Sequence, residues 1–342
     1  MPLNKTGPVI LDVLSFALND EEKEVLCHPQ VGGVILFGRN IDSAKQVADL
    51  TRHIRSTNPN LLLCVDQEGG RVQRLKNGFT RLPPMGHLGQ LYSSEPALAL
   101  DISEQLGWLM ASEVLGVGID LSFAPVLDVD SHFSQVIGDR AFSPVPMQVE
   151  LLGGAFMAGM QRAGMANCGK HFPGHGSVKA DSHLELPVDA RPMQAIEEHD
   201  LRPFRALLPK LAALMPAHII FPAVDPNPVG FSAAWLQGIL RKQMGFNGVI
   251  ISDDLSMAGA AFAGDYPARA QMALEAGCDG ILVCNQPAKA HQVLEFLEGI
   301  NRKTDGRLQT LQSQSALPLA LLHAEAPWHQ ANELIARYLS NT

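Results

Sequence analysis

Eight short runs of apolar, β-forming residues recur along this chain, and each is followed by a stretch with helical spacing. The runs do not alternate between apolar and polar residues, which is typical of strands buried on both faces of a parallel sheet. Eight such strands alternating with helices are what a (β/α)8 barrel of the TIM type requires. The predicted strands are residues 9–13, 33–37, 61–65, 120–126, 167–171, 214–220, 248–252 and 279–284.

The segments between these runs carry apolar residues on one helical face. Ser43 is a candidate N-cap for the helix that follows it, and Gly277 is a candidate C-cap. No linker or change of composition divides the chain, so we predict an α/β protein in which residues 1–342 form one barrel domain with C-terminal helical decoration. The predicted helices are residues 43–54, 97–115, 203–214, 233–244 and 267–276, with two terminal helices at 288–300 and 328–339.

Composition narrows the class of partner. The net charge of -9 argues against nucleic acid or an anionic membrane as the partner. The five cysteines contain no CxxC pair and are odd in number, so neither a disulfide framework nor a structural zinc site is expected. The first residues lack a signal-peptide pattern, and no apolar run approaches the ~20 residues of a membrane span. We therefore expect a cytoplasmic protein.

Acidic and basic side chains follow most of the predicted strands. A strand-end aspartate is by default a helix cap or a loop residue, but polar residues after so many strands at once favour an active site. In a barrel these positions share the C-terminal face, where barrel enzymes place their catalytic groups. The residues are Asp66, Asp128, Asp130, Lys170, His171, His218, Asp253 and Asp254.

Residues 170–183, KHFPGHGSVKADSH, form the densest group of titratable side chains. Pro173 and Gly174 exclude a helix interior or a regular strand, so we predict a loop. Asp181 and His183 stand two residues apart on it. A carboxylate bonded to one imidazole nitrogen raises the basicity of the other, which suits histidine to proton transfer. A solvated surface loop with weak metal affinity is the alternative.

His171 and His175 have the i, i+4 spacing of a zinc-binding pair. The proline and glycine between them prevent the helix that would align both rings, so we do not expect a metal site. We expect residues 173–176 to let the loop fold over a bound ligand instead.

The segment VIISDDLSM, residues 249–257, runs from a buried strand directly into two acids. The Asp253 carboxylate is expected to point from the strand end toward the barrel mouth, where it can act as nucleophile, general base or metal ligand. Neighbouring residues of a strand point in different directions, so Asp254 is expected to cap the next helix.

The segment VDQEGGRVQR ends a predicted strand in an acid and a pair of glycines. Asp66 can accept hydrogen bonds from neighbouring sugar hydroxyls, and Arg74 can donate two parallel bonds to an oxygen-rich group. The alternative is that Arg71 and Arg74 pair with Glu68 on a surface turn, and the spacing leaves both interpretations open. Arg140, in IGDRAF, is a loop arginine, and such residues are usually solvated.

Several segments together resemble glycoside hydrolase family 3, most closely its NagZ-type β-N-acetylhexosaminidases. They are GGVILFGRN, VDQEGGRVQR, GDRAF, KHFPGHG, DSH, MPAH and SDDLSM, and the resemblance covers roughly residues 1–290. Each motif alone is moderate support, whereas their joint order and spacing are specific to the family.

The resemblance implies a barrel enzyme that removes terminal β-linked N-acetylglucosamine (GlcNAc) with retention of configuration and needs no cofactor or metal. By matching motif, Asp253 would be the nucleophile and His183 the acid/base, with Asp181 orienting His183. The implied sugar-binding residues are Asp66, Arg74, Arg140, Lys170 and His171.

The implied substrate is a small amino-sugar fragment of the cell wall. It is a muropeptide, GlcNAc joined to a 1,6-anhydro-N-acetylmuramic acid peptide, which is degraded in the cytoplasm during peptidoglycan recycling. We expect the chain to act on it as a monomer, with neither nucleic acid nor membrane as a partner.

Two other functions fit the sequence less well. A metal-dependent hydrolase of the amidohydrolase kind needs an HxH pair after the first strand, and LDVLSF supplies none. A sugar-binding barrel without activity would keep Asp66 and Lys170, but it has no use for Asp253 together with the pair of Asp181 and His183.

Overall fold

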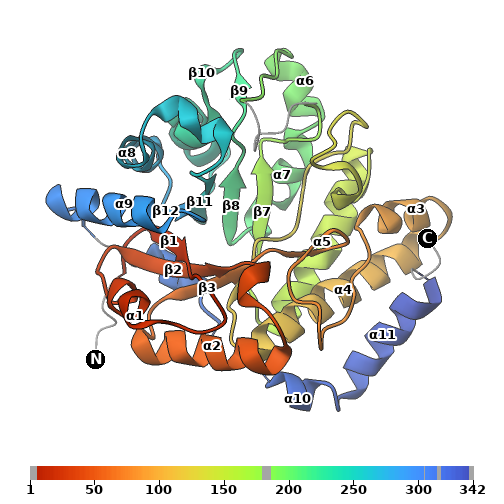
Figure 1. The fold of residues 1–342 in the computed structure, drawn as a ribbon. Coiled ribbons are helices and arrows are strands. Elements are labelled where there is room, and N and C mark those ends of the chain that lie inside the picture. Colours follow the sequence, from red (N-terminus) through yellow and green to blue (C-terminus); the bar gives the residue numbers. More distant parts are fainter. Residues whose placement is uncertain (1–5, 179–185, 304, 314–316, 339–342) are drawn as a thin grey trace.

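Eight parallel strands form a nearly closed barrel at the centre of the structure (Figure 1). The computed structural model describes residues 6–178, 186–303, 305–313 and 317–338. The barrel strands are β1 (Val9–Asp12), β2 (Val31–Leu36), β3 (Leu62–Val65), β6 (Leu121–Ser122), β7 (Cys168–Phe172), β8 (Ala213–Pro216), β11 (Val249–Asp254) and β12 (Gly280–Val283). Their order is β6-β3-β2-β1-β12-β11-β8-β7. A parallel bridge between Val126 and Lys170 joins the two ends, which confirms the predicted (β/α)8 barrel.

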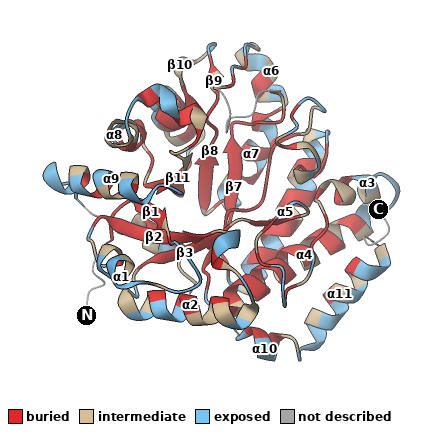
Figure 2. Cartoon of the chain, in the orientation of Figure 1, coloured by how far each residue is buried: buried red, intermediate tan, exposed pale blue. Residues whose placement is uncertain are grey.

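The barrel wall is buried on both faces (Figure 2). Ile10 and Leu62 belong to the cluster inside the barrel, whereas their neighbours Val9 and Leu63 belong to the larger cluster between the wall and the helices. Successive residues of a strand point to opposite faces. Both faces here are therefore apolar, which explains why the strand segments show no alternation.

Helices surround the barrel, and their outward faces are exposed (Figures 1 and 2). They are α1 (Asp20–Leu26), α2 (Ala44–Thr57), α3 (Gly86–Ser94), α4 (Pro96–Gly116), α5 (Pro146–Ala163), α6 (Met193–Glu198), α7 (Leu201–Leu207), the π-helix η5 (Ala234–Gln243), α8 (Tyr266–Ala276), α9 (Pro287–Gly299), α10 (Leu319–Leu322) and α11 (Ala326–Tyr338). The Ser43 side chain accepts a hydrogen bond from the Gln46 amide, and Gly277 ends α8, as predicted. Within the described ranges, no helix has the length and apolar character to cross a membrane.

Short 3-10 turns and two small ribbons complete the described chain. The turns are η1 (Gly38–Asn40), η2 (Gly138–Arg140), η3 (Leu208–Lys210), η4 (Val229–Phe231), η6 (Ala258–Ala263) and η7 (Arg307–Leu311). The antiparallel ribbons are β4 (Gln67–Gly69) with β5 (Val72–Gln73), and β9 (Ile220–Phe221) with β10 (Asp225–Pro228). Turn η7 covers the N-terminal end of the barrel, because Leu308 and Leu311 join the inner cluster.

The helix α5 has no counterpart among the predicted helices. It packs so closely on α4 that a Cβ at Gly107 would lie 2.0 Å from the carbonyl oxygen of Phe156. A Cβ at Gly159 would likewise lie 2.0 Å from the carbonyl oxygen of Glu104. Glycine lowers helix propensity, so Gly159, which allows this contact, also weakens the helical pattern of α5 in the sequence.

Three predicted elements are shorter than expected. The fourth strand was predicted over residues 120–126, but β6 contains only Leu121–Ser122, and Val126 adds an isolated bridge to Lys170 after Pro125. The sixth strand was predicted over residues 214–220, but β8 ends at Pro216, and Ile220 bonds to Pro187 at the rim instead. The helix predicted over 203–214 ends at Leu207 and passes into η3, because Pro209 cannot donate the next helical hydrogen bond.

Candidate active site

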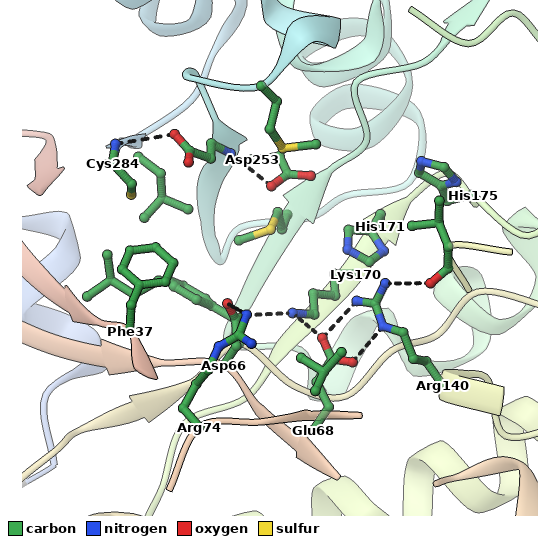
Figure 3. A pocket seen from close by; sticks show the side chains of 18 of the residues that line it. Phe37, Asp66, Glu68, Arg74, Arg140, Lys170, His171, His175, Asp253 and Cys284 are labelled. Atoms are coloured by element: carbon green, nitrogen blue, oxygen red, sulfur yellow. Dashed lines mark hydrogen bonds and ion pairs between the residues drawn. The ribbon is translucent and has the colours of Figure 1, made fainter. Parts of the chain in front are cut away.

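A cavity of about 710 Å³ opens at the C-terminal end of the barrel strands (Figure 3). Phe123, Met215 and Leu282 from the inner cluster form an apolar floor. The charged lining comes mostly from strand ends and the loops after them, as the sequence predicts. The acidic, basic and histidine side chains that line the cavity are Asp66, Glu68, Arg71, Arg74, Arg140, Lys170, His171, His175, Asp253 and Asp254.

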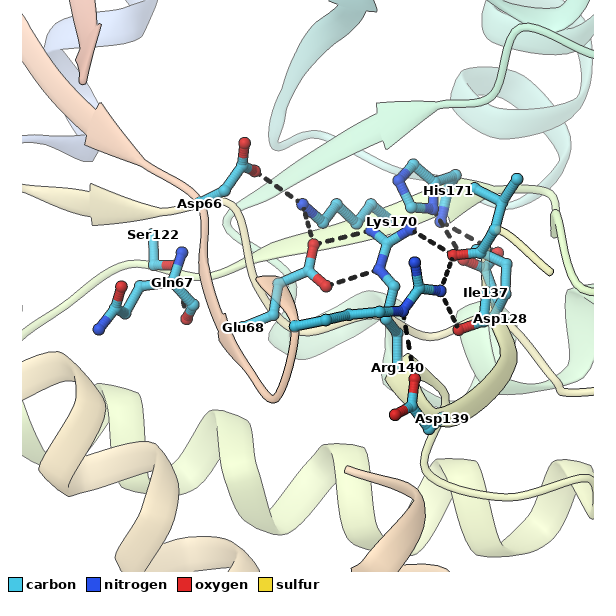
Figure 4. Close-up of polar contacts among 12 residues, drawn as sticks. Asp66, Gln67, Glu68, Ser122, Asp128, Ile137, Asp139, Arg140, Lys170 and His171 are labelled. Atoms are coloured by element: carbon cyan, nitrogen blue, oxygen red, sulfur yellow. Dashed lines mark hydrogen bonds and ion pairs between the residues drawn. The ribbon is translucent and has the colours of Figure 1, made fainter. Parts of the chain in front are cut away.

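Lys170 lies at the centre of a chain of alternating charges (Figure 4). Its Nζ is 3.0 Å from Oδ1 of Asp66 and 2.6 Å from Oε1 of Glu68. Arg140 donates from Nε and Nη2 to the two oxygens of Glu68, each at 2.8 Å. Nη2 of Arg74 lies 3.6 Å from Oδ2 of Asp66. Three cations thus share two carboxylates, an arrangement that suits a ligand rich in oxygen atoms.

The charges of this network stabilise one another. Burial opposes ionisation of Glu68, but the charges of Lys170 and Arg140 outweigh it and hold the pKa of Glu68 well below its usual range. Burial likewise opposes the charge on Lys170, but Asp66 and Glu68 outweigh it and raise the Lys170 pKa. All three buried groups, Glu68, Lys170 and Arg140, are therefore ionised near neutral pH.

The structure rules out a surface turn that pairs Glu68 with Arg71 and Arg74. Glu68 is 4% exposed and faces the cavity. Nε of Arg71 instead lies 3.3 Å from Oδ1 of Asp139. Arg140, expected from its loop position to be solvated, has a side chain only 10% exposed, because it crosses into the cavity to reach Glu68.

Strand geometry explains why Asp66 and Glu68 act together. Two residues apart on an extended segment, they lie on the same side, while Gln67 between them points away. The Gln67 side chain donates to the carbonyl of Leu75 and accepts from the amides of Arg74 and Leu75. Glu68 was not predicted as a functional residue, although its i, i+2 spacing from Asp66 was the available signal.

A second buried carboxylate lies behind His171. Oδ2 of Asp128 is 2.7 Å from Nδ1 of His171, and Oδ1 accepts from the backbone amides of His171 and His175. Burial opposes ionisation of Asp128, but the neighbouring His171 outweighs it and lowers the Asp128 pKa. Burial and the nearby His171 together lower the pKa of His175 to about 4, so His175 is neutral near neutral pH.

Asp253 and Asp254 end β11 and line the cavity. Figure 3 shows Asp253 there. Oδ1 of Asp253 accepts from the amide of Asp254 at 2.8 Å. The Asp254 carboxylate accepts from the amide and hydroxyl of Ser256 and from the amide of Cys284. Asp254 therefore fixes the turn after the strand. The expectation that it caps the next helix is wrong, because Asp265 caps α8.

Burial raises the pKa of Asp254 to about 6, with the nearby charge of Asp253 adding to the effect. The hydrogen bonds from Ser256 and Cys284 act in the opposite direction. The Asp254 carboxyl group therefore holds its proton to a higher pH than an exposed aspartate does.

Comparison with known proteins assigns the chain to a family. Residues 9–312 match the model of the glycosyl hydrolase family 3 N-terminal domain. The chain belongs to glycoside hydrolase family 3. A β-hexosaminidase of Tolumonas auensis is 52% identical over 325 residues, which span 94% of this chain and 95% of that protein. A β-hexosaminidase of Pseudomonas aeruginosa is 51% identical over 308 residues, which span 90% and 91%.

The fold of this family 3 hydrolase is also similar to a solved structure. The crystal structure of NagZ from Neisseria gonorrhoeae in complex with N-trifluoroacetyl-D-glucosamine is 41% identical, with a TM-score of 0.92. The match covers 99% of this chain and 100% of that chain. The resemblance seen in the motifs is therefore confirmed at the level of the family and the barrel.

Two expected site residues of this family 3 chain, Asp181 and His183, lie outside the described residues. The described residues before them are closely packed. A Cβ at Gly176 would lie 1.8 Å from the carbonyl oxygen of Val129. The Ser177 hydroxyl is 2.9 Å from Oδ1 of the buried Asp200. The stem of the loop after β7 is thus fixed against the barrel.

The cavity does not include every polar residue predicted near the strand ends. His218 is buried, stacks on Phe231 with ring centroids 5.4 Å apart, and has Nε2 3.2 Å from the carbonyl oxygen of Asp254. In the part of the chain that the structure describes, no three His, Cys, Asp or Glu side chains are grouped so as to hold a metal ion.

Proposed function

We propose that this glycoside hydrolase is a retaining exo-β-N-acetylglucosaminidase. The observation that carries the proposal is the Asp253 carboxylate, at a strand end, on the opposite side of one cavity from the network of Asp66, Glu68 and Lys170 (Figure 3). One side offers a nucleophile and the other a set of hydroxyl-binding groups. The β-hexosaminidase names of the relatives, and the glucosamine derivative bound to the similar structure, support the same substrate class.

The proposed reaction has two steps. In the first, Asp253 attacks the anomeric carbon while protonated His183 gives its proton to the leaving oxygen, so one carbon–oxygen bond forms as the other breaks. In the second, neutral His183 takes a proton from water, and that water oxygen displaces Asp253 from the sugar. Asp181 orients the His183 ring and stabilises its charged form. The roles of His183 and Asp181 rest on the motif DSH.

We assign sugar binding to Asp66, Arg74, Arg140, Lys170 and His171. All five line the cavity, and their carboxylate, guanidinium, ammonium and imidazole groups can bond to sugar hydroxyls. The apolar floor of Phe123, Met215 and Leu282 supports a blind pocket that accepts one terminal sugar. Removal of one residue at a time from the end of a chain follows from that shape.

We further propose a muropeptide as the physiological substrate, GlcNAc linked to a 1,6-anhydro-N-acetylmuramic acid peptide, degraded in the cytoplasm during peptidoglycan recycling. The cavity lining supports an anionic substrate. Among the described residues that line it, four acids are balanced by one lysine and three arginines, whereas the whole chain carries a net charge of -9. We propose that the whole chain forms one catalytic domain that acts as a monomer.

Covalent trapping tests the nucleophile, the retaining mechanism and the sugar class together. We expect 5-fluoro-GlcNAc fluoride to inactivate the enzyme and peptide mass spectrometry to place the glycosyl label on Asp253. We also expect Asp253→Ala to lose at least 10³-fold in kcat on an aryl β-N-acetylglucosaminide. A label on another residue, or wild-type turnover by Asp253→Ala, would contradict the proposal.

A further inference from the structure

Glu68 is the most enclosed carboxylate of the cavity wall, and its oxygens are occupied by protein donors. Nε and Nη2 of Arg140 and Nζ of Lys170 all bond to it, at 2.8, 2.8 and 2.6 Å. We propose that Glu68 is a positioning residue that fixes Lys170 and Arg140 so that their remaining N–H groups meet the sugar. This inference rests on the proposed sugar-binding function of the same cavity.

Glu68 and Asp66 differ in burial, and we infer different roles for them from this difference. The Glu68 side chain is 4% exposed and takes three charged donors, which leaves little room or acceptor capacity for a hydroxyl group. The Asp66 side chain is 19% exposed, and among the described residues its ion-pair partners are Lys170 and the more distant Arg74. Asp66 can therefore bind a ligand directly, whereas Glu68 acts through its two cations.

Lys170 and Arg140 have more N–H groups than their bonds to the protein use. The Lys170 ammonium has three N–H groups, and Asp66 and Glu68 occupy two of them. The Arg140 guanidinium has five, of which Glu68 takes two and the carbonyl of Val136 takes one, at 3.0 Å. With respect to the described residues, one N–H of Lys170 and two of Arg140 remain, and their directions are set by the bonds to Glu68.

Electrostatics gives the second reason. Lys170 and Arg140 are both buried and both positive, so they repel one another, and the Glu68 carboxylate bonded to both offsets this repulsion. Without the charge of Glu68, the Lys170 ammonium keeps Asp66 as its nearest anion and shifts toward it. That shift has two effects: Asp66 has fewer lone pairs left to accept hydrogen bonds from the sugar, and the free N–H of Lys170 no longer points at the sugar.

The direct test is the Glu68→Gln variant, which keeps the shape of the side chain and removes its charge. We expect the Kd for free GlcNAc, measured by calorimetry, to rise about 10- to 100-fold, because small misplacements of binding groups cost this much. We expect kcat/KM on an aryl β-N-acetylglucosaminide to fall by a similar factor. Glu113→Gln is the matched control, since Glu113 is also buried but bonds to Thr80 and Trp328 away from the cavity.

A double-mutant cycle with Lys170→Met tests whether Glu68 acts through Lys170. We expect the combined loss in kcat/KM to be at least fivefold smaller than the product of the two single losses, because the second substitution removes an interaction already broken. A purely structural role gives multiplied losses and would overturn the inference. If Glu68→Gln does not fold, Glu68→Asp keeps the charge but not the reach, and we expect its Kd for GlcNAc to rise.

The outcomes separate this inference from the proposed function. Wild-type protein that does not bind GlcNAc would contradict the proposed function itself. Wild-type protein that binds GlcNAc, together with a folded Glu68→Gln or Glu68→Asp variant of unchanged Kd, would overturn only the positioning role.

Discussion

Nδ1 of His171 lies 2.7 Å from Oδ2 of Asp128, a carboxylate that is completely buried. The same carboxylate accepts the backbone N–H groups of His171 and His175. Because Asp128 is ionised, the proton of a neutral His171 ring resides on Nδ1, and Nε2 is left for a ligand. One buried acid thus sets both the tautomer of a cavity histidine and the path of the chain after it.

Asp128→Asn should weaken catalysis without changing the cavity wall. The amide cannot accept with both of its polar atoms, so either the ring or the backbone N–H groups lose a partner. Hydrogen bonds to charged groups contribute about 1.5–3 kcal/mol, and we expect kcat/KM on an aryl β-N-acetylglucosaminide to fall about 10- to 100-fold. Steady-state kinetics measures this directly. Asp130→Asn is the control, because Asp130 bonds to the exposed His132; equal kcat/KM for both variants would contradict the role of Asp128.

Gly176→Ala should displace the stem of the loop after β7. The new Cβ would lie 1.8 Å from the carbonyl oxygen of Val129, so one of the two backbones must move. We expect at least a 10-fold loss in kcat/KM and a decrease of about 1–3 kcal/mol in the free energy of unfolding. Gly299→Ala is the control, since no atom lies within 4 Å of its Cβ position. Wild-type kcat/KM for Gly176→Ala would show that this contact does not matter for catalysis.

Asp254 should make the free energy of unfolding depend on pH. Its pKa is raised from 3.8 in the unfolded chain to about 6 in the fold, so between these values the folded protein holds a proton that the unfolded chain has lost. Ionisation of Asp254 therefore lowers stability as pH rises from 4 to 6, by up to about 3 kcal/mol. We expect the Asp254→Asn variant to lack this decrease.

The measurement is urea unfolding of both proteins from pH 4 to pH 8. Other groups titrate in this range, so the informative quantity is the difference between Asp254→Asn and the wild type at each pH. We expect that difference to shift in favour of the variant up to about pH 6 and then stay constant. A difference that is flat across the whole range would contradict the assignment.

Only one of the five cysteines should react readily in the native protein. All five are free, but Cys27 is exposed and the other four are buried. Burial raises the pKa of Cys168 to about 12 and also raises the pKa of Cys64, Cys278 and Cys284, so the reactive thiolate is scarce there. We expect iodoacetamide to add one group, at Cys27, by intact mass and peptide mapping. Cys27→Ser should then remain unmodified, and rapid addition at any of the other four would contradict the burial argument.

Much of the barrel could be predicted from local pattern. Continuous apolar runs indicated strands buried on both sides, and Val9 and Ile10 show why, since one packs outside the wall and the other inside. The helix α5 was missed because it contains Gly153, Gly154 and Gly159, of which Gly159 is needed for close contact with α4, and glycine weakens the helical pattern. The sixth strand was predicted to extend too far, because the end of β8 depends on where the adjacent strands of the barrel stop pairing with it.

The sequence by itself determined the order of the strands, the polar residues at their ends and the motifs that identify the family. Only the tertiary structure decided which charges pair. Glu68 bonds to Lys170 and to Arg140, which lies 72 residues further along the chain. Asp128 bonds to His171, which lies 43 residues further along. Local spacing instead offered Arg71 and Arg74 as partners for Glu68. Strand and helix periods are properties of a few neighbouring residues, whereas a buried ion pair depends on which distant segments the closed barrel brings together.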